Sequence, residues 1–357
     1  MSSGIETRKI AIEALERIQH KGAFANLVLG PMIERTSLSA RDRAFVTELV
    51  YGTTRMRRAL DHLIDPFLHG EVDDHVRTVL QLGTYQLHYM DTPPHAAVDA
   101  TVGSARKRVR GLINAVLRRV AEVTPEFPTD GIRLSYPDWM IERLSADIGR
   151  DQTIAALEAM NRPAITHTRA DGYVQDPASQ EVVAMVNAGP GDVVVDLCAA
   201  PGGKATGISH GGAHVVAGDL RLKRARLMAR NAKATGSRLA TLAADARRFP
   251  VRPGSADIVL LDAPCSGIGS LRRRPDARWR IDRDAPERLG QIQRQLLAAA
   301  LPMVKPGGRL VYSVCTMTAA ETTAVVAGLE WHAISDPVFR LPDSEGDGMW
   351  SQIFRAP

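Results

Sequence analysis

Two short segments place thiols where apolar strands are expected to end. Asp262-Ala-Pro-Cys265 follows the apolar run Ile258–Leu261, and Cys315 follows the run Leu310–Val314. If both runs are parallel strands of one sheet, their carboxyl ends share an edge, and the two sulfurs can face one crevice. A buried cysteine is usually an inert small hydrophobe, but two thiols beside a carboxylate suggest more than packing.

These residue types suit chemistry at C5 of a cytosine ring. A thiolate that adds to C6 makes C5 electron-rich enough to accept a methyl group. A second thiol can help to remove the C5 proton or to release the product, while a carboxylate such as Asp262 holds the N3 edge of the base. The residues alone do not decide which of Cys265 and Cys315 attacks.

A small-residue loop follows another apolar run, Val193–Val195, and leads into an expected helix after Gly203. It consists of Cys198, Ala199, Ala200, Pro201, Gly202, Gly203 and Lys204. Backbone amides of such a turn can approach a ligand closely. The loop lacks the G-x-G-x-x-G pattern of dinucleotide sites and the Gly-Lys-Ser/Thr ending of phosphate loops. We therefore expect an adenosyl ligand without phosphates, and we expect Cys198 to be structural.

Two further acids follow later strands in the order that such a ligand requires. Asp219 ends the run that begins at His214, where a ribose-binding carboxylate belongs, and Asp245 follows a third strand, where it can accept from an adenine amino group. Each of them alone could equally be a helix cap or a solvated loop residue.

Two basic segments are candidates for binding RNA. The first has no acid among its cations Arg106, Lys107, Arg108, Arg110, Arg118 and Arg119, several of which would share one face of a helix. The second contains Arg272, Arg273, Arg274 and Arg278 beside Trp279, and we expect its charge and its proline to keep it out of a core. Guanidinium groups beside an aromatic ring suit phosphates and unstacked bases, although either segment could be a solvated surface.

The chain has 357 residues and a formal charge of +5. The spacing of its apolar residues changes twice along the sequence. Helical spacing of apolar residues predicts a helical domain over 1–123, with a helix starting after Ser39 and breaks at Gly30-Pro31, Gly52 and Pro93-Pro94. Residues 124–170 are expected to be a linker with a helical stretch at Asp138–Met160. Over 171–357 short Val- and Ile-rich runs alternate with amphipathic stretches, which predicts a parallel sheet of βαβ units.

The composition limits the class of protein further. Three cysteines are too few for a disulfide framework, and no apolar run is long enough for a membrane span. We expect a cytoplasmic protein without a membrane or metal partner.

Several motifs together resemble the Fmu/Sun (RsmB-like) family of RNA (cytosine-5) methyltransferases. The resemblance rests on residues 174–180, 196–204, 245–247, 262–267, 274–279 and 312–315 together with Asp219, and on the segments 111–118 and 135–139 of the first half. It implies an all-α NusB-like RNA-binding domain followed by a Rossmann-like class I methyltransferase domain that uses S-adenosylmethionine.

The same resemblance assigns roles to individual residues. Residues 198–204, Asp219, Asp245 and Asp262 would contact S-adenosylmethionine. Cys315 would attack C6, Cys265 would assist release, and Asp262 and Lys204 would complete the catalytic set. The expected product is 5-methylcytosine in small-subunit (16S) ribosomal RNA, formed by a monomer.

The sequence departs from the family pattern in places. Only Ala164–Asp171 stand where the family has a small RNA-holding subdomain, so transfer RNA stays open as a substrate, as does a non-catalytic RNA-binding assembly role. Glu321-Thr-Thr and Asp347-Gly-Met-Trp350 replace usual family stretches. In the family pattern neither stretch touches the thiols or the cofactor loop, so the resemblance implies that both changes are tolerated.

Overall fold

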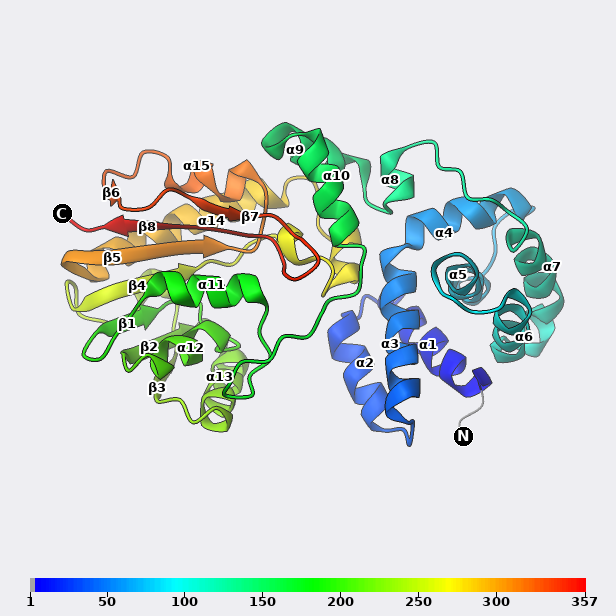
Figure 1. The fold of residues 1–357 in the computed structure, drawn as a ribbon, viewed down its shortest axis with the longest axis horizontal. Helices are drawn as coiled ribbons and strands as arrows, with labels where there is room; N and C mark the ends of the chain where they lie inside the picture. The colour runs from blue at the N-terminus through cyan, green and yellow to red at the C-terminus, as the bar shows by residue number, and fades with distance from the viewer. Residues whose placement is uncertain (1–3) are drawn as a thin grey trace. The chain divides into compact units, whose positions relative to one another are not determined.

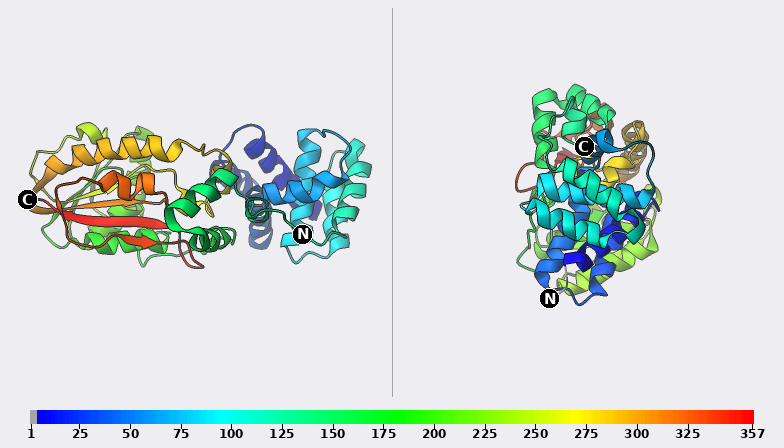
Figure 2. Two further views of the ribbon diagram at one scale, coloured as in Figure 1. Left: turned by 90° about the horizontal axis from the view of Figure 1, so that it is seen from above. Right: turned by 90° about the vertical axis from the view of Figure 1, so that its right-hand side faces the viewer.

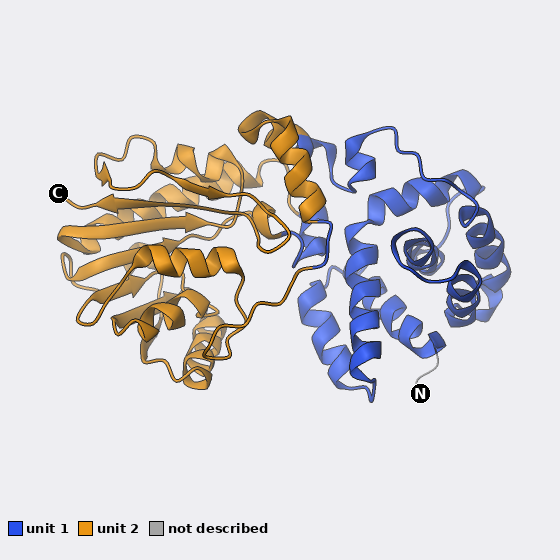
Figure 3. Cartoon of the chain, viewed as in Figure 1, with its two compact units in different colours: residues 1–141, 161–163, 271–280 blue, residues 142–160, 164–270, 281–357 orange. Residues whose placement is uncertain are grey.

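The computed structural model describes residues 4–357, which form two compact units that are not contiguous in sequence (Figure 3). The helical unit contains the described residues up to Ile141, together with Asn161–Pro163 and Leu271–Arg280. The catalytic unit contains Glu142–Met160, Ala164–Ser270 and Ile281–Pro357. The chain therefore returns to the helical unit for ten residues directly after the loop that carries Cys265.

The helical unit is built around one long buried helix, α5, which Figure 1 shows end-on with other helices around it. Its helices are α1 (Gly4–Gln19), α2 (Ala25–Glu34), α3 (Ala40–Arg55), α4 (Arg57–Ile64), α5 (Asp74–Tyr89), α6 (Pro94–Ser104), α7 (Arg110–Val120) and α8 (Asp130–Arg133). Apolar residues from α1 to α7 form a single core, as the helical periodicity predicts.

Some of the expected helix boundaries are confirmed and others are wrong. Ser39 caps α3 by accepting the backbone N–H of Asp42, and α6 begins at Pro94. Pro31 lies inside α2, and Gly52 lies inside α3. Gly52 is there for close helix packing, because a Cβ at this position would lie 2.0 Å from the ring of Tyr85.

The expected helical stretch Asp138–Met160 divides into two helices. They are α9 (Asp138–Ile148) and α10 (Arg150–Ala159). Gly149 separates them with a φ of +85°, a conformation that side chains other than glycine's rarely tolerate.

The catalytic unit is an eight-stranded sheet in the order β3-β2-β1-β4-β5-β8-β6, with β7 also paired to β8. Its strands are β1 (Val193–Asp196), β2 (His214–Asp219), β3 (Leu239–Ala243), β4 (Ala256–Asp262), β5 (Val304–Val314), β6 (His332–Ala333), β7 (Val338–Arg340) and β8 (Met349–Arg355). Its other helices are α11 (Pro177–Val186), α12 (Gly203–His210), α13 (Leu222–Ala234), α14 (Ala285–Ala300) and α15 (Thr323–Val326).

Strands β1 to β5 are parallel, as the alternating texture predicts, but β8 runs antiparallel to β5. The sheet is therefore mixed, and the expectation of a wholly parallel sheet is wrong at this edge.

The central strands are buried on both faces, so neighbouring residues point into different cores. Val194 and Leu260 pack with α11, α12 and α13, whereas Val195 and Leu261 pack with α14. Figure 2 shows α14 and α11 on opposite sides of the sheet. This three-layer arrangement fixes the strand ends, where the candidate chemical residues lie.

Candidate active site

The carboxyl ends of β1, β4 and β5 form the centre of the site. Strand order reverses between β1 and β4, which is where open α/β sheets bind ligands. Asp196 ends β1, Asp262 ends β4, and Cys315 directly follows β5. Asp262 pairs in register with Ser313, which brings the Asp262–Cys265 loop beside Cys315.

The two thiols are in contact. The sulfurs of Cys265 and Cys315 lie 3.3 Å apart, and the hydroxyl of Ser270 donates to Cys315 Sγ at 3.8 Å. The hydrogen bond with Cys315, together with burial, raises the pKa of Cys265 well above its ordinary value. Cys265 therefore keeps its proton at neutral pH, and it can donate that proton to the neighbouring sulfur.

Asp262 is held by donors on two sides. Lys204 Nζ donates to Asp262 Oδ2 at 2.7 Å, and Ser313 Oγ donates to Oδ1 at 2.9 Å. Burial opposes the charge of Lys204, but the carboxylate and its hydrogen bond outweigh burial and raise the pKa of Lys204. The ammonium group also interacts electrostatically with Cys315. A cation beside a thiol favours its ionised, nucleophilic form.

Glu321 is a site residue that the sequence reasoning missed. Its buried carboxylate accepts from Ser266 N and Oγ, from the hydroxyls of Thr316 and Thr318, and from Gln293 Nε2, at 2.5–3.2 Å. Ser266 directly follows Cys265, and Thr316 directly follows Cys315. One carboxylate therefore ties the two thiol loops together, through the residues that follow the thiols rather than through the sulfurs themselves. The run of hydroxyl residues before Glu321 was the available signal.

The other stretch that departs from the family pattern also reaches a thiol loop. The N–H of Gly348 donates to Gly269 O at 2.7 Å, and Gly269 N donates to Cys315 O at 3.1 Å. Gly348 therefore braces the loop between the two cysteines.

The loop from Cys198 to Lys204 is rigidly held at the start of α12. Gly202 has a φ of +106°, and it precedes the helix as its cap residue. Arg224 Nη2 donates to Ala200 O at 2.5 Å, and Asn231 Nδ2 donates to Pro201 O at 2.9 Å. These bonds anchor the loop through its carbonyl groups, so its turn presents a fixed backbone surface beside the sheet edge.

The far side of the same loop is clamped by an arginine that the sequence reasoning did not select. Arg169 donates to Gly203 O at 2.5 Å, to Thr206 Oγ1 at 2.8 Å, to Gln175 Oε1 at 2.9 Å and to both oxygens of Asp171. A Cβ on Gly203 would lie 2.9 Å from the ring of Tyr173. The position therefore requires glycine because a neighbouring segment packs tightly against it.

The two acids expected at the ligand lie at successive strand ends. Asp219 is the last residue of β2, is 6% exposed, accepts from Arg221 N at 3.0 Å and pairs with Arg224 at 3.3 Å. Asp245 lies two residues past β3, where hydrogen bonds from Arg247 lower its pKa to about 2. Their contacts are those of local caps: in each acid both carboxylate oxygens bond or pair with nearby arginine groups.

Asp196 ends β1, and Cys198 is the first residue of the loop that runs to Lys204. Asp196 is buried, and Cys198 packs against the core. Burial raises the pKa of the Cys198 thiol well above its ordinary value. Burial, with a contribution from Asp262, raises the pKa of Asp196 to about 8. Both groups are therefore mostly protonated at neutral pH.

The first basic segment does not form one helical face. Residues 107–109 form a 3-10 turn, and only Arg110, Arg118 and Arg119 lie on α7. Arg110 donates to Ala105 O and Gly103 O at the end of α6. Arg106 and Arg108 are exposed, and they reach Glu16 and Asp73 at 3.9 and 3.7 Å.

The second basic segment is partly core, so the expectation that its charge excludes it from a core is wrong. Arg272 and Arg278 are 1% and 0% exposed. Arg278 donates to Arg55 O, Ser135 O, Asn161 Oδ1 and Tyr136 Oη at 2.8–3.1 Å, and it stacks on the Tyr136 ring. These four acceptors offset much of the cost of burying this cation, although burial lowers its pKa to about 10. These two arginines therefore do not present their guanidinium groups to RNA in this structure, whereas Arg274 is exposed.

Residues 4–357 lack two other kinds of feature. None of the helices there combines the length and hydropathy needed to cross a membrane. The same residues contain no group of three or more His, Cys, Asp or Glu side chains placed to hold a metal ion.

Comparison with known proteins identifies the family. Residues 183–335 match the family described as 16S rRNA methyltransferase RsmB/F, and residues 5–122 match the NusB family. Ribosomal RNA small subunit methyltransferase B of Thermus thermophilus is 36% identical over 89% of this chain and 86% of that protein. The chain belongs to the RsmB family of RNA methyltransferases. It is an S-adenosylmethionine-dependent RNA cytosine-5 methyltransferase with an N-terminal NusB domain, as the motifs predict.

Further relatives agree with this assignment. The enzyme of the same name from Shigella flexneri is 33% identical over 88% of each chain. The solved structure titled "Crystal Structure of PH0851" aligns over 98% of each chain with a TM-score of 0.75 at 21% identity. That likeness confirms the expected fold, which combines a helical first region with an α/β domain.

Proposed function

We propose that this RsmB-family enzyme forms 5-methylcytosine in 16S ribosomal RNA through a transient bond between Cys315 and C6 of the target base. The observation that carries the proposal is the contact of the two sulfurs at 3.3 Å, at the strand ends where Lys204 and Asp262 meet. Relatives that carry the name ribosomal RNA small subunit methyltransferase B support the choice of substrate.

The reaction can be assigned to residues of this chain. The Cys315 thiolate adds to C6, and the electron pair of the C5–C6 double bond moves to C5, which then forms the new carbon–carbon bond. Asp262, which accepts hydrogen bonds from Lys204 and Ser313, holds the base at its N3 edge while charge develops there. The Cys265 thiol gives its proton to the departing Cys315 sulfur and, as a thiolate, takes the C5 proton. The Cys315–C6 bond breaks and the C5–C6 double bond is restored.

The methyl donor has a fitting site on the same edge. Cys198 to Lys204, Asp219, Asp245 and Asp262 would hold S-adenosylmethionine, which supplies an electrophilic methyl group. The anchored turn at Gly202 supports this assignment, because it offers backbone amides in a fixed position. Asp219 would hold the ribose and Asp245 the adenine.

The binding of RNA by the basic segments is also a proposal. Arg106, Lys107, Arg108 and Arg274 are exposed cations, and we assign them to phosphate contacts. Each such contact contributes to affinity in a salt-dependent way. Removing one should therefore weaken binding without changing which base is methylated.

The test is methyl transfer to isolated small-subunit rRNA, followed by bisulfite sequencing of small-subunit rRNA and of transfer RNA. We expect one protected cytosine in the ribosomal RNA, and none when Cys315 is replaced by alanine. Protection confined to transfer RNA would contradict the substrate. Absence of transfer to either RNA by protein that binds S-adenosylmethionine would favour a non-catalytic assembly role.

A further inference from the structure

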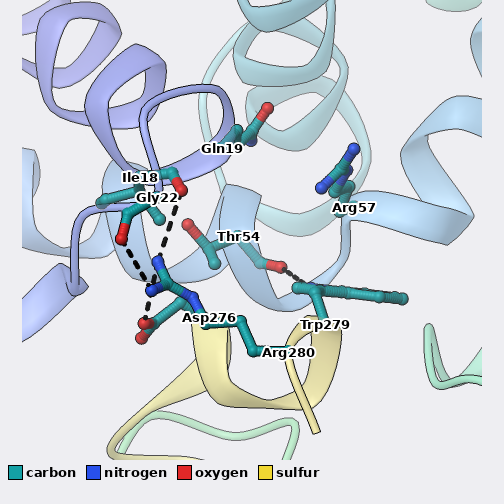
Figure 4. A pocket seen from close by; sticks show the side chains of 8 residues that line it. All are labelled: Ile18, Gln19, Gly22, Thr54, Arg57, Asp276, Trp279 and Arg280. Carbon is teal, nitrogen blue, oxygen red and sulfur yellow. Dashed lines mark hydrogen bonds and ion pairs between the residues drawn. The ribbon is translucent and has the colours of Figure 1, made fainter. Parts of the chain in front are cut away.

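The helical unit contains a half-open cavity of about 190 Å³ that the proposed reaction does not use (Figure 4). It lies where the returning segment Leu271–Arg280 packs against the end of α1 and against α3 and α4. Its lining includes the side chains of Gln19, Thr54, Arg57, Asp276, Trp279 and Arg280.

The aromatic wall of the cavity is fixed in place. Trp279 Nε1 donates to Thr54 O at 2.8 Å, so the edge of the indole is anchored while the ring lines the cavity. Arg280 bonds to Gly22 O at 2.9 Å and pairs with Asp276 at 3.5 Å, which balances the one acid of the lining. The cavity is therefore preformed, with one flat apolar wall.

The opposite wall is cationic and polar. Figure 4 shows Arg57 across from the ring of Trp279. Arg57 interacts electrostatically with the Asp61 carboxylate, and both polar atoms of the Gln19 amide are buried without a hydrogen-bond partner. A flat ring with donors and acceptors on its edge and a phosphate attached would satisfy these groups together.

The size of the cavity limits the ligand to a single ring system. A cavity of about 150 Å³ admits a benzene molecule, so the present volume suits one base rather than a base pair or a peptide segment. Unstacked bases of single-stranded RNA stack on aromatic rings and on guanidinium planes.

We propose that this cavity binds one unstacked base of single-stranded RNA, stacked on Trp279 and with Arg57 at its other face or its phosphate. This inference rests on the proposed function only in taking RNA as the partner. It adds a nucleotide subsite in the helical unit. A short segment of the chain joins Cys265 to Trp279.

Ultraviolet crosslinking tests the location directly. The full-length protein is irradiated with a short unstructured oligoribonucleotide that carries 5-bromouridine, and the crosslinked peptides are mapped by mass spectrometry. We expect a crosslink in the peptide that contains Trp279. Crosslinks confined to other peptides would overturn the proposal.

Binding measurements on variants test the chemistry. Trp279→Leu should weaken the affinity for the same oligonucleotide by about 5- to 150-fold, the usual range for one stacked base. Trp279→Phe keeps a ring and should bind within a few-fold of the wild type. Arg57→Gln should weaken binding more than the matched control Arg41→Gln, an exposed cation of α3 outside the cavity. Equal binding by the wild type, Trp279→Leu and Arg57→Gln would contradict the proposal, and Trp279→Phe and Arg57→Gln guard against misfolding of the leucine variant.

Methyl transfer measured on the same preparations separates the two proposals. A Trp279 crosslink without methyl transfer to any RNA supports the cavity subsite and contradicts the proposed function. Methyl transfer to ribosomal RNA without a Trp279 crosslink overturns the subsite and leaves the proposed function intact.

Discussion

Two fully buried acids of the catalytic unit have opposite surroundings. Five hydrogen bonds converge on the Glu321 carboxylate, whereas no side chain donates to Asp196 in the described part of the chain. Both residues are 0% exposed. Burial raises the pKa of Asp196 to about 8, so this carboxyl group is neutral in most of the folded molecules at pH 7.

The contrast shows two ways in which a core tolerates an acid near a reaction site. A carboxylate that receives enough donors can organise the groups that donate to it, as Glu321 does for the two thiol loops. An acid without such donors keeps its proton, and its ionisation then opposes folding. Asp262 lies between these cases, because it has two donors and is partly exposed.

Removal of the organising acid should have the largest effect. Glu321→Ala removes the acceptor for Ser266 N and for four donor side chains, and we expect a loss of about 3–4 kcal/mol in the free energy of unfolding. The thiol loops should also lose their alignment, with methyl transfer reduced by about 100-fold. Urea unfolding and single-turnover assays measure both effects. The exposed Glu330→Ala is the control, and an equally small effect at both positions would remove the distinction drawn above.

Asp196, to which no side chain donates in the described part of the chain, should make the free energy of unfolding depend on pH. The pKa of Asp196 is about 8 in the folded protein and about 3.9 in an unfolded chain. The folded state therefore holds a proton that the unfolded state loses between these values, and stability falls as pH rises from about 4 to 8.

Asp196→Asn should abolish that dependence. We expect the variant to exceed the wild type by about 5 kcal/mol at pH 8 and to match it below about pH 4. Urea unfolding across this pH range is the measurement. A wild type whose stability rises from pH 5 to pH 8 in parallel with the variant would contradict a protonated Asp196.

Loss of the Lys204 ammonium should make the Asp262 carboxylate destabilise the folded protein. Lys204→Met leaves the Ser313 hydroxyl as a side-chain donor to Asp262 but removes the ammonium donor, and we expect a destabilisation of about 1–3 kcal/mol. Methyl transfer should fall more steeply than cofactor affinity if Lys204 acts on Asp262 and Cys315 rather than on the cofactor. The exposed Lys223→Met is the matched control. Equal effects at the two positions would show that the ion pair has no role.

Much of the catalytic unit was predictable because its signals are local. Short runs of Val and Ile mark buried strands, and the polar residues directly after them mark the ligand edge, which placed Asp262, Cys265 and Cys315 correctly on adjacent strand ends. Antiparallel β8 was missed because no helix separates it from β7, so it lacks the alternating texture of the earlier strands.

Other features depend on pairings between distant residues that no local pattern reveals. Arg278 looks like a surface cation in sequence, but carbonyl groups from Arg55 and Ser135 satisfy it in the core. Gly52 looks like a helix break, but it makes room for Tyr85. Glu321 looks like a family deviation, and its role follows only once Ser266 and Thr316 are side by side.

The central claim concerns which sulfur bonds to the base. Cys265→Ala protein incubated with S-adenosylmethionine and small-subunit rRNA should accumulate a protein–RNA adduct that survives denaturation, because addition by Cys315 proceeds while release is impaired. The double variant with Cys315→Ala should form none. An adduct that forms when Cys315 is alanine and Cys265 is intact would contradict the account.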